Sequence, residues 1–420
     1  MRTDRCPGAL ALHEAADGWL ARVRLPGGRL TCLQLRALAE IAGLGNDLVE
    51  LTARANVQVR GLQEAAGEEL AARLAAAGLL PSLTHERIRN VLASPLAGRH
   101  PRAGADVDAL VARLDRELCA DVGLAKLPRR FLFLVEDGSG ALQGHDHDIA
   151  LVADPTSAGE FALVLGGVDS GWRAPAEDAP ALALAAARLF LATSEGVWRM
   201  RDLPKGPRPV IDALACTHLP ATARRGEHAL VWAQAAGREV TAGRTVQRDG
   251  RVALTALVPL GRLQAVQLRA LADVGAEVRL SPWRTLSLVD LPDDAPAAIL
   301  TAIGLVLDPD SGWAGLSACA GFGACKRARI DVRGAAAARA RTRARDAPRE
   351  HWSACGRRCG ELRGTPVIVA ADGDGLVLCT PTSAREGMPA GAETRIVADV
   401  DAALAMLRET SDPSAPEPVR

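Results

Sequence analysis

The chain has 420 residues, with 50 basic and 50 acidic side chains and therefore a formal net charge of zero at pH 7. This length predicts more than one domain. The charge balance argues against a general nucleic-acid-binding surface, and no apolar run reaches the roughly 18 residues needed to cross a membrane. Residues 1–30 carry charges throughout and contain no apolar signal-peptide core. We therefore expect a cytoplasmic protein with reduced thiols.

The chain contains an internal repeat. Residues 28–40 (GRLTCLQLRALAE) and 261–273 (GRLQAVQLRALAD) match at nine of 13 positions without a gap. Leucines at helical spacing predict an amphipathic helix in each copy. Alternating apolar and polar residues predict flanking strands, and a further helix is expected at 64–78 and at 295–304. This order of elements predicts two half-units of the ferredoxin-like type.

A longer segment of mixed pattern follows each half-unit. Strand-like runs occur at 130–137, 148–154, 161–167, 366–372 and 375–381, and helical patterns at 105–118 and 399–409. We therefore predict an α+β protein with a duplicated, pseudo-twofold arrangement. In chain order its parts are a half-domain at 5–80, an α+β domain at 85–205, a linker at 206–246, a second half-domain at 247–308, a second α+β domain at 312–408 and a disordered tail at 410–420.

Four cysteines in the second half have the spacing of a metal centre. Cys319 and Cys325 form C-x5-C, and Cys355 and Cys359 form C-x3-C after a gap of 29 residues. Four sulfurs brought to one place suit an iron–sulfur cluster or a zinc ion. The five-residue spacer fits structural zinc poorly, so we favour iron–sulfur. The alternative is that the four cysteines are small buried side chains without a metal, as we expect for the five scattered ones.

The surroundings of these cysteines also suit a cluster. Cys355 and Cys359 lie four residues apart, so a helical turn would direct both thiols the same way. Neighbouring glycines allow main-chain N–H groups to approach cluster sulfurs. The arginine-rich stretch 326–345 joins the two pairs, and we expect it to be helical and mostly solvated, with a docking surface as the alternative.

Three segments of the first half carry a resemblance to a known family. Residues 52–58 resemble the Thr-x-Arg-x-x-x-Gln strand of the sulfite and nitrite reductases, and residues 89–91 resemble their Arg-Asn-Val segment. Residues 127–131 resemble their Leu-Pro-Arg-Lys-Phe segment, with Arg130 in place of Lys. The duplicated half-units and the cysteine pattern agree with this resemblance.

The resemblance implies a tetrapyrrole carrying several carboxylates, bound between the two halves. Arginine is suited to gripping carboxylates with two hydrogen bonds. On a strand, Arg54, Asn56, Gln58 and Arg60 would share one face, which is either a binding floor or a solvated sheet surface. The expected substrate-binding residues are Arg54, Asn56, Gln58, Arg60, Arg89, Asn90, Arg130 and Arg284, the last as a mirror of Arg54.

Within these proteins the chain is most similar to the precorrin-3B synthase family. The similar segments are residues 6–10, 25–28, 280–285 and 351–360. The resemblance implies a monooxygenase of aerobic cobalamin biosynthesis that hydroxylates precorrin-3A at C20 with lactone formation. It would use dioxygen, a [4Fe-4S] cluster and electrons from NADH. Because no G-x-G-x-x-G turn follows a predicted strand, the electrons are expected to arrive through a separate donor protein.

Two other functions stay open. A sirohaem-dependent sulfite or nitrite reductase would share the fold and the cluster, but those enzymes carry Lys or Asn where this chain has Leu132. An electron carrier or a non-catalytic tetrapyrrole-binding protein is the other alternative.

The resemblance also implies a second, non-haem iron. His145 and His147 belong to the densest group of nitrogen and carboxylate ligands, His-Asp-His-Asp at 145–148, and could hold it. The alternative interpretation of this segment is a polar turn that leads into the strand at 148.

Overall fold

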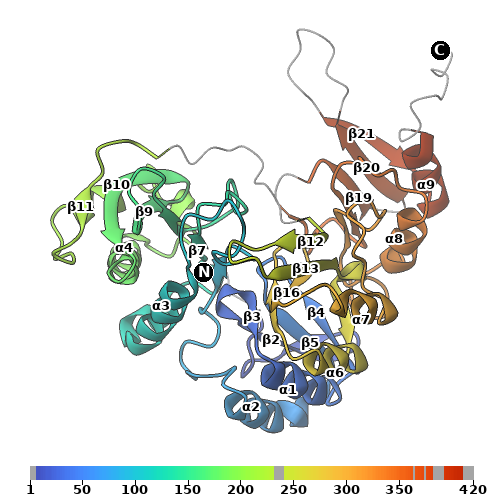
Figure 1. Cartoon of the computed structure of the whole chain (residues 1–420). Coiled ribbons are helices and arrows are strands. Elements are labelled where there is room, and N and C mark those ends of the chain that lie inside the picture. Colours follow the sequence, from blue (N-terminus) through green and yellow to red (C-terminus); the bar gives the residue numbers. More distant parts are fainter. Residues whose placement is uncertain (1–5, 231–240, 363–364, 373–374, 382–391, 410–420) are drawn as a thin grey trace.

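The computed structural model describes residues 6–230, 241–362, 365–372, 375–381 and 392–409. The tail predicted at 410–420 lies outside these residues, as does the 231–240 part of the predicted linker. The chain forms two half-domains and two α+β domains (Figure 1). Among the described residues, no helix is both long enough and apolar enough to pass through a bilayer.

The two half-domains repeat the same order of elements. The first contains β1 (His13–Ala15), β2 (Gly18–Val23), the 3-10 helix η1 (Pro26–Gly28), β3 (Arg29–Leu30), α1 (Cys32–Ala42), β4 (Leu48–Leu51), β5 (Val57–Leu62), η2 (Glu64–Ala66) and α2 (Gly67–Ala76). The second contains β12 (Gly243–Val246), β13 (Val252–Leu257), η5 (Pro259–Gly261), β14 (Arg262–Gln264), α6 (Ala265–Asp273), β15 (Glu277–Leu280), β16 (Thr285–Leu291) and α7 (Pro296–Ala302). The residues before α1 and α6, Thr31 and Gln264, begin capping boxes with Gln34 and Gln267.

The two α+β domains also repeat one another. The first contains β6 (Val91–Ala93), α3 (Asp108–Ala120), η3 (Val122–Lys126), β7 (Phe133–Glu136), β8 (Ile149–Ala153), β9 (Glu160–Leu165), β10 (Val168–Pro175), α4 (Ala179–Thr193), η4 (Met200–Asp202), α5 (Arg208–Leu214) and β11 (Arg224–Arg225). The second contains β17 (Leu316–Ala318), α8 (Val332–Ala340), β18 (Glu350–Ser353), β19 (Val367–Asp372), β20 (Gly375–Pro381), β21 (Ala392–Val397) and α9 (Val400–Glu409). In each sheet the first three strands are parallel and the next is antiparallel. The predicted duplicated α+β fold is therefore confirmed. The predicted linker at 206–246 is too long, because β11 pairs with β10 of the first α+β domain and β12 pairs with β13 of the second half-domain.

Each half-domain lends a strand to the sheet of the other. The first sheet has the order β1-β2-β5-β4-β14 and the second has the order β12-β13-β16-β15-β3. Leu30 thus pairs with Val278, and Leu263 pairs with Val49. The crossing is so close that a Cβ on Gly28, which has φ of 66°, would lie 2.4 Å from the carbonyl oxygen of Leu280. A side chain at position 28 would therefore push the two halves apart.

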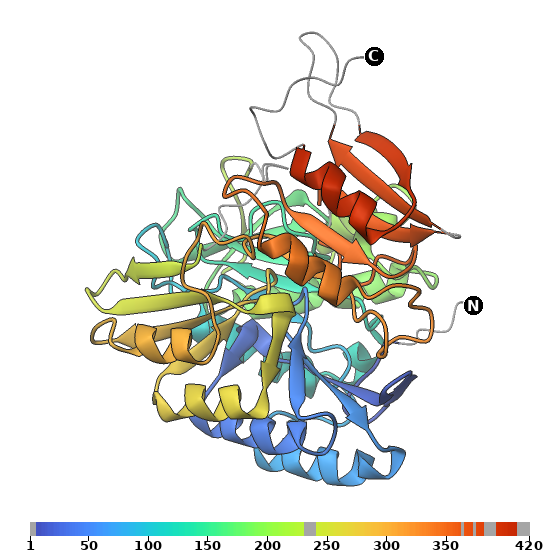
Figure 2. The same ribbon diagram turned by 90° about the vertical axis from the view of Figure 1, so that its right-hand side faces the viewer.

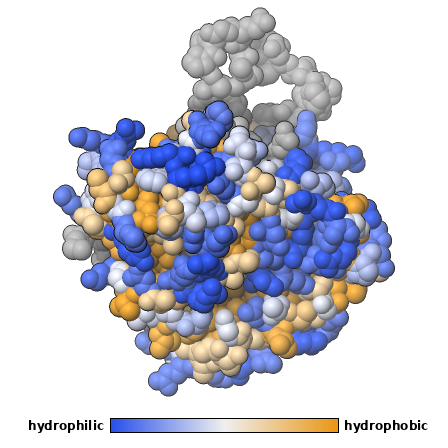
Figure 3. Space-filling view, turned by 60° about the vertical axis from the view of Figure 1, so that its left-hand side comes forward, coloured by the Kyte–Doolittle hydropathy of each residue, from blue (hydrophilic) through white to orange (hydrophobic). Residues whose placement is uncertain are grey.

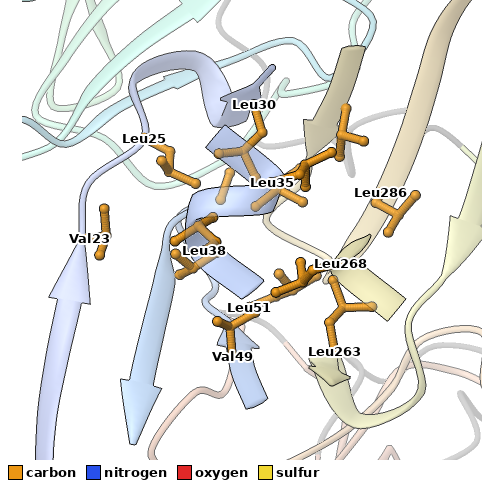
Figure 4. Packing of buried hydrophobic residues seen from close by; sticks show 14 of the residues in the cluster. Val23, Leu25, Leu30, Leu35, Leu38, Val49, Leu51, Leu263, Leu268 and Leu286 are labelled. Atoms are coloured by element: carbon orange, nitrogen blue, oxygen red, sulfur yellow. The ribbon is translucent and has the colours of Figure 1, made fainter. Parts of the chain in front are cut away.

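One apolar core lies between the exchanged sheets. Leu30, Leu35 and Leu38 of the first half face Leu263 and Leu268 of the second (Figure 4). Helices α1 and α6 pack against each other, and α2 packs against α1 along the base of the molecule (Figure 2). On the outer face shown in Figure 3, hydrophilic residues are mixed with smaller hydrophobic patches. The buried apolar side chains therefore hold the halves together.

The exchange predicts that the short strand β3 is needed for stability. Leu30 is 1% exposed and Leu33, three residues later, is 79% exposed. Leu30→Ala should lower the free energy of unfolding by about 2 to 5 kcal/mol because it leaves a cavity between the halves. Leu33→Ala should change it by less than about 0.5 kcal/mol. Denaturant unfolding followed by circular dichroism measures both, and equal effects would contradict the role given to β3.

Candidate active site and metal centre

The four cysteines lie on two loops at one edge of the second α+β sheet. Cys319 follows β17 and Cys355 follows β18, and these strands are parallel, so their carboxyl ends meet at the same edge. The main-chain N–H of Cys319 donates to the carbonyl of Trp352 at 2.9 Å. The N–H of Ala354 donates to the sulfur of Cys319 at 3.2 Å. The two loops are thus joined at their bases.

Cys359 lies close enough to the other three cysteines for their charges to act on its thiol. The pKa of Cys359 is raised, first by burial and then by the charges of Cys319, Cys355 and Cys325. In the described part of the chain, no three His, Cys, Asp or Glu side chains are placed to hold a single metal ion. A four-iron cluster takes one thiolate per iron, so its ligands stand farther apart than those of one ion. If the four neighbouring thiols ionised, their negative charges would repel one another. The positive charge of a bound iron–sulfur core would offset that repulsion, so the arrangement fits such a cluster.

The C-x3-C segment differs from the helical turn that its spacing predicts. Residues 354–360 form turns, and Arg358 has φ of 50°. The arginine-rich stretch is helical only over α8, and Arg339 and Arg343 within it are buried beside Glu350. The prediction of a mostly solvated helix is therefore wrong for these two arginines.

The residues from Thr52 to Asn56 form a closed turn between β4 and β5. The N–H of Thr52 donates to the carbonyl of Asn56, and the Thr52 hydroxyl accepts from the N–H groups of Arg54 and Asn56. The predicted continuous strand, and with it the shared face of four polar side chains, is therefore wrong. Of the four polar residues expected on this strand, only Gln58 and Arg60 lie on β5.

The second half contains the same turn with other side chains. Ser281 takes the place of Thr52 and makes the same hydrogen bonds to residues 283–285. Ala55 and Arg284 both have positive φ, 54° and 62°. Arg284 is therefore the counterpart of Ala55, whereas the counterpart of Arg54 is Trp283. The expected mirror relation between Arg54 and Arg284 is wrong by one residue.

Three of the predicted substrate-binding residues are engaged in structural contacts. Asn56 and Asn90 are buried and bonded to each other at 3.3 Å, and Asn56 accepts from the N–H of Leu25. Arg89 is 4% exposed and donates to both carboxylate oxygens of Asp115, at 2.7 and 2.6 Å. The Asn56–Asn90 bond joins the first half-domain to the first α+β domain, whereas Arg89 and Asp115 both belong to that α+β domain.

The remaining predicted residues surround two different places. Arg54 donates to the carbonyl of Arg130 at 2.9 Å, and the Arg130 guanidinium lies 5.6 Å from the centre of the Trp198 ring. Gln58 bonds to Arg22 and Glu50 on either side. By contrast, the side chains of Arg60 and Arg284 reach the cysteine loops, at the carbonyls of Ala324 and Gly360.

A group of arginines that the sequence did not single out lies beside Arg54. Arg22 and Arg24 each approach the sulfur of Cys6 at 3.5 Å. Arg24 is 3% exposed, and its Nε and Nη1 have no hydrogen-bond partner among the described residues. Arg22 and Arg24 lie two residues apart at the end of β2, so the alternation of that strand was the signal that could have identified them. We call Arg22, Arg24 and Arg54 the basic pocket.

Burial lowers the pKa of two arginines of the basic pocket, Arg24 and Arg54. The pKa of Arg24 is lowered by burial and then by the charge of Arg22. Burial, followed by the charge of Arg199, lowers the pKa of Arg54 to about 10. Both guanidinium groups are still charged at neutral pH. Buried charges without counter-charges are unfavourable, so this pocket is suited to receiving an anion.

In the first half, the place of the cysteine loops is filled by a network of carboxylates and amides. Ser94 corresponds to Cys319, because Asp137 donates its N–H to the Ser94 hydroxyl at 3.0 Å just as Ala354 does to the sulfur. The carboxylate of Glu136 accepts from the N–H groups of residues 140 and 142. The same edge of the fold is thus closed by hydrogen bonds in one half and carries four thiols in the other.

The segment predicted to hold a second iron is tied into the first α+β domain. His147 donates from Nδ1 to the carbonyl of His145 at 2.9 Å and accepts at Nε2 from the N–H of Gly167 at 3.2 Å. Asp146 and Asp148 pair with Arg199. The second iron at His145 and His147 stays a prediction, and the hydrogen bonds seen here agree with the polar-turn interpretation.

These hydrogen bonds predict acid destabilisation. Burial lowers the pKa of His147 to about 4, and a proton on Nε2 would face the Gly167 N–H. The unfolded chain takes up this proton below about pH 6.5 and the folded chain does not, so stability should fall by about 3 kcal/mol as the pH drops from 6.5 to 4. His147→Gln, which keeps an acceptor, should lose this part of the pH dependence. Urea unfolding at pH 7 and pH 4.5 measures it, and unchanged pH dependence in the variant would contradict the assignment.

Comparison with known proteins identifies the repeated unit. The model of the nitrite/sulfite reductase ferredoxin-like half domain matches residues 13–77 and 245–305. The solved structure of the NirA protein of Mycobacterium tuberculosis superimposes with a TM-score of 0.72, at 20% identity, over 96% of this chain and 82% of NirA. The fold is therefore that of NirA.

Curated relatives extend this result. A precorrin-3B synthase from Sinorhizobium is 28% identical over 93% of this chain and 85% of its own length. The ferredoxin–nitrite reductase of Synechococcus elongatus is 26% identical over 82% of this chain and 74% of its length. Sulfite reductase [ferredoxin] 2 of Mycolicibacterium paratuberculosis is 25% identical over 75% of this chain, and the match spans only 61% of that reductase. The chain therefore carries the nitrite/sulfite reductase ferredoxin-like half domain twice and is similar to oxidoreductases over most of its length.

Proposed function

We propose that the chain is a precorrin-3B synthase-like monooxygenase with one [4Fe-4S] cluster on Cys319, Cys325, Cys355 and Cys359. The precorrin-3B synthase relative supports this choice because the match covers most of both chains. The proposed reaction hydroxylates precorrin-3A at C20 and closes a lactone with a ring acetate. One atom of dioxygen enters the product and the other becomes water, which consumes two protons and two electrons that come from NADH.

The basic pocket would bind the carboxylates of the tetrapyrrole. Arg22 lies on β2, Arg24 follows directly after that strand, and Arg54 lies in the turn at 52–56, so the first half-domain supplies all three arginines. The unpartnered Nε and Nη1 of Arg24 would gain carboxylate oxygens, and the charge of Arg54 would be offset in the same way. Binding would therefore remove the unfavourable burial of these charges.

The observation that carries the choice of a synthase over a reductase is the burial of Leu132. This residue is 2% exposed, and its side chain belongs to the apolar core. By resemblance, a sulfite or nitrite reductase has Lys or Asn at this position, where a polar group helps to bind and protonate a small anion. A buried leucine cannot donate a proton, whereas dioxygen needs no charged group to bind. Leu132 therefore supplies no proton donor of the kind that a sulfite or nitrite reductase would use, which favours the synthase.

The cluster would supply single electrons to the site. Surface residues near the cysteine loops would bind the electron-donor protein. Phe322 is 70% exposed in the first cysteine loop, and Lys326, Arg327 and Arg357 are exposed nearby. A basic surface with one exposed aromatic side chain suits an acidic electron-transfer protein. We propose such a protein as the intermediate between NADH and this chain.

A sirohaem-dependent sulfite or nitrite reductase is the second candidate. It is favoured by the names of two relatives and by the same basic pocket, which would suit sirohaem as well as precorrin-3A. The cofactor content separates the two functions.

Anaerobically purified protein is expected to contain about four irons and four sulfides per chain, with a broad visible absorption band and no haem bands. It should then convert precorrin-3A only when dioxygen and a reductant are both present. Metal and sulfide analysis with visible spectroscopy is the measurement. Sirohaem bands would favour the reductase, and zinc without sulfide would contradict both functions.

Removing a charge from the basic pocket should weaken porphyrin binding and stabilise the free protein. Arg24→Met should weaken the binding of a polycarboxylated porphyrin such as uroporphyrin by at least about tenfold, because a charged hydrogen-bonding group is lost. The same change should stabilise the free protein by about 1 to 4 kcal/mol, because an unpaired buried charge is removed. Fluorescence titration and denaturant unfolding measure the two effects.

Arg36→Met is the control for this experiment, because Arg36 lies on the exposed face of α1 and pairs with Asp273. It should leave porphyrin binding unchanged. If Arg24→Met binds as tightly as Arg36→Met, Arg24 is not part of the binding site.

A further inference from the structure

Arg60 connects the first half-domain to the first cysteine loop. It is 5% exposed on β5 and donates to the two carboxylate oxygens of Asp17 at 2.9 and 2.8 Å. Its Nη2 also donates to the carbonyl of Ala324, the residue before Cys325. The carboxylate of Glu50 lies 3.9 Å away on the same sheet. The guanidinium is thus held by carboxylates of its own half-domain and turned toward the loop.

Arg284 connects the second half-domain to the second cysteine loop. It is 8% exposed, and its Nη2 donates to the carbonyl of Gly360, the residue after Cys359, at 2.5 Å. Two glycines leave room for its side chain: a Cβ on Gly261 would lie 2.6 Å from its Cδ, and a Cβ on Gly360 would lie 2.8 Å from its Nη2. A glycine on each of the two segments that Arg284 joins therefore leaves space for its side chain.

The two arginine contacts hold the parts of the cysteine loops that strand pairing does not hold. Cys319 and Cys355 directly follow β17 and β18, so strand pairing fixes their positions. Cys325 and Cys359 lie at the far ends of their loops, beyond that pairing. Arg60 and Arg284 each donate to a carbonyl next to one of these two distal cysteines.

We propose that Arg60 and Arg284 are positioning residues of the iron–sulfur centre. Each fixes the distal cysteine of one loop to a different half-domain, so the exchanged half-domains set the separation of all four thiols. This inference rests on the cluster of the proposed function, and it replaces the substrate-binding role that the sequence suggested for both arginines.

Lysine substitutions test the proposal because they keep the charge but not the fork of donors. Arg60→Lys and Arg284→Lys should lose the cluster to a chelator at least about tenfold faster than the wild type, as expected when a group that orients metal ligands is removed. The electron paramagnetic resonance spectrum of the reduced cluster should also change. Bleaching of the visible band in the full-length, anaerobically purified protein gives the rate.

The chain offers matched controls for both variants. Arg89 is 4% exposed and forms a two-oxygen pair with Asp115, and Arg279 is 1% exposed and pairs with Asp108, but neither donates to a cysteine loop. Arg89→Lys and Arg279→Lys should lose the cluster within about twofold of the wild-type rate. Equal rates in all four variants at similar thermal midpoints would overturn the proposal. If one positioning variant does not fold, the other decides the test.

A separate measurement distinguishes failure of this proposal from failure of the proposed function. If the wild-type protein binds no iron and sulfide, the proposed cluster is wrong. Hydrogen exchange of the metal-free protein then tests the arginines alone. Amides at 322–325 in Arg60→Lys and at 356–360 in Arg284→Lys should exchange at least about tenfold faster than in the controls. Unchanged exchange would overturn the positioning role.

Discussion

The exchange of β3 and β14 between the half-domains is the constraint on which the rest of the structure depends. Each short strand completes the sheet of the other half, so neither half can bury its apolar face alone. The close crossing at Gly28 and Leu280 fixes how far apart the halves lie. The basic pocket lies on the first half, and arginines from both halves reach the cysteine loops. The exchange therefore fixes the distance between the pocket and the loops. The two halves of one chain thus exchange strands as the two subunits of a symmetric dimer can do.

Duplication also allowed the halves to take different chemistry on the same backbone. The turns at 52–56 and 281–285 share their hydrogen bonds and their positive φ, yet one presents Arg54 and the other presents Trp283 at the equivalent place. In the same way, Ser94 occupies the position of Cys319, and carboxylates close the loops that bear thiols in the second half. At the two turns the main-chain hydrogen bonds are the same, so the difference there lies in the side chains. One half thus carries the arginines of the basic pocket, and the other carries the four cysteines.

Arginine has two uses in this chain, and its partners distinguish them. Arg60 and Arg89 donate to carboxylates, so their charges are compensated inside the protein. Arg284 donates to a main-chain carbonyl, and burial lowers its pKa to about 10. Arg24 keeps buried donors without partners, and its pKa is lowered by burial. An arginine with buried donors that lack partners would gain most from an incoming carboxylate. Burial together with missing partners therefore makes Arg24 the stronger candidate for a binding residue.

The sequence by itself determined the duplication, the α+β class and which cysteines form the candidate metal centre, because repeats, periodicity and spacing are local properties. A short motif also singled out Arg54, whose pKa is lowered first by burial and also by the charge of the neighbouring Arg22. The turn at 52–56 was missed because a Thr-to-Asn hydrogen-bonded turn interrupts an alternation that otherwise reads as one strand. Only the tertiary structure decided that Arg60 and Arg284 point to the cysteine loops and that Arg22 and Arg24 form the basic pocket. Their partners lie up to 264 residues away along the chain, and such contacts depend on how the sheets pack rather than on neighbouring residues.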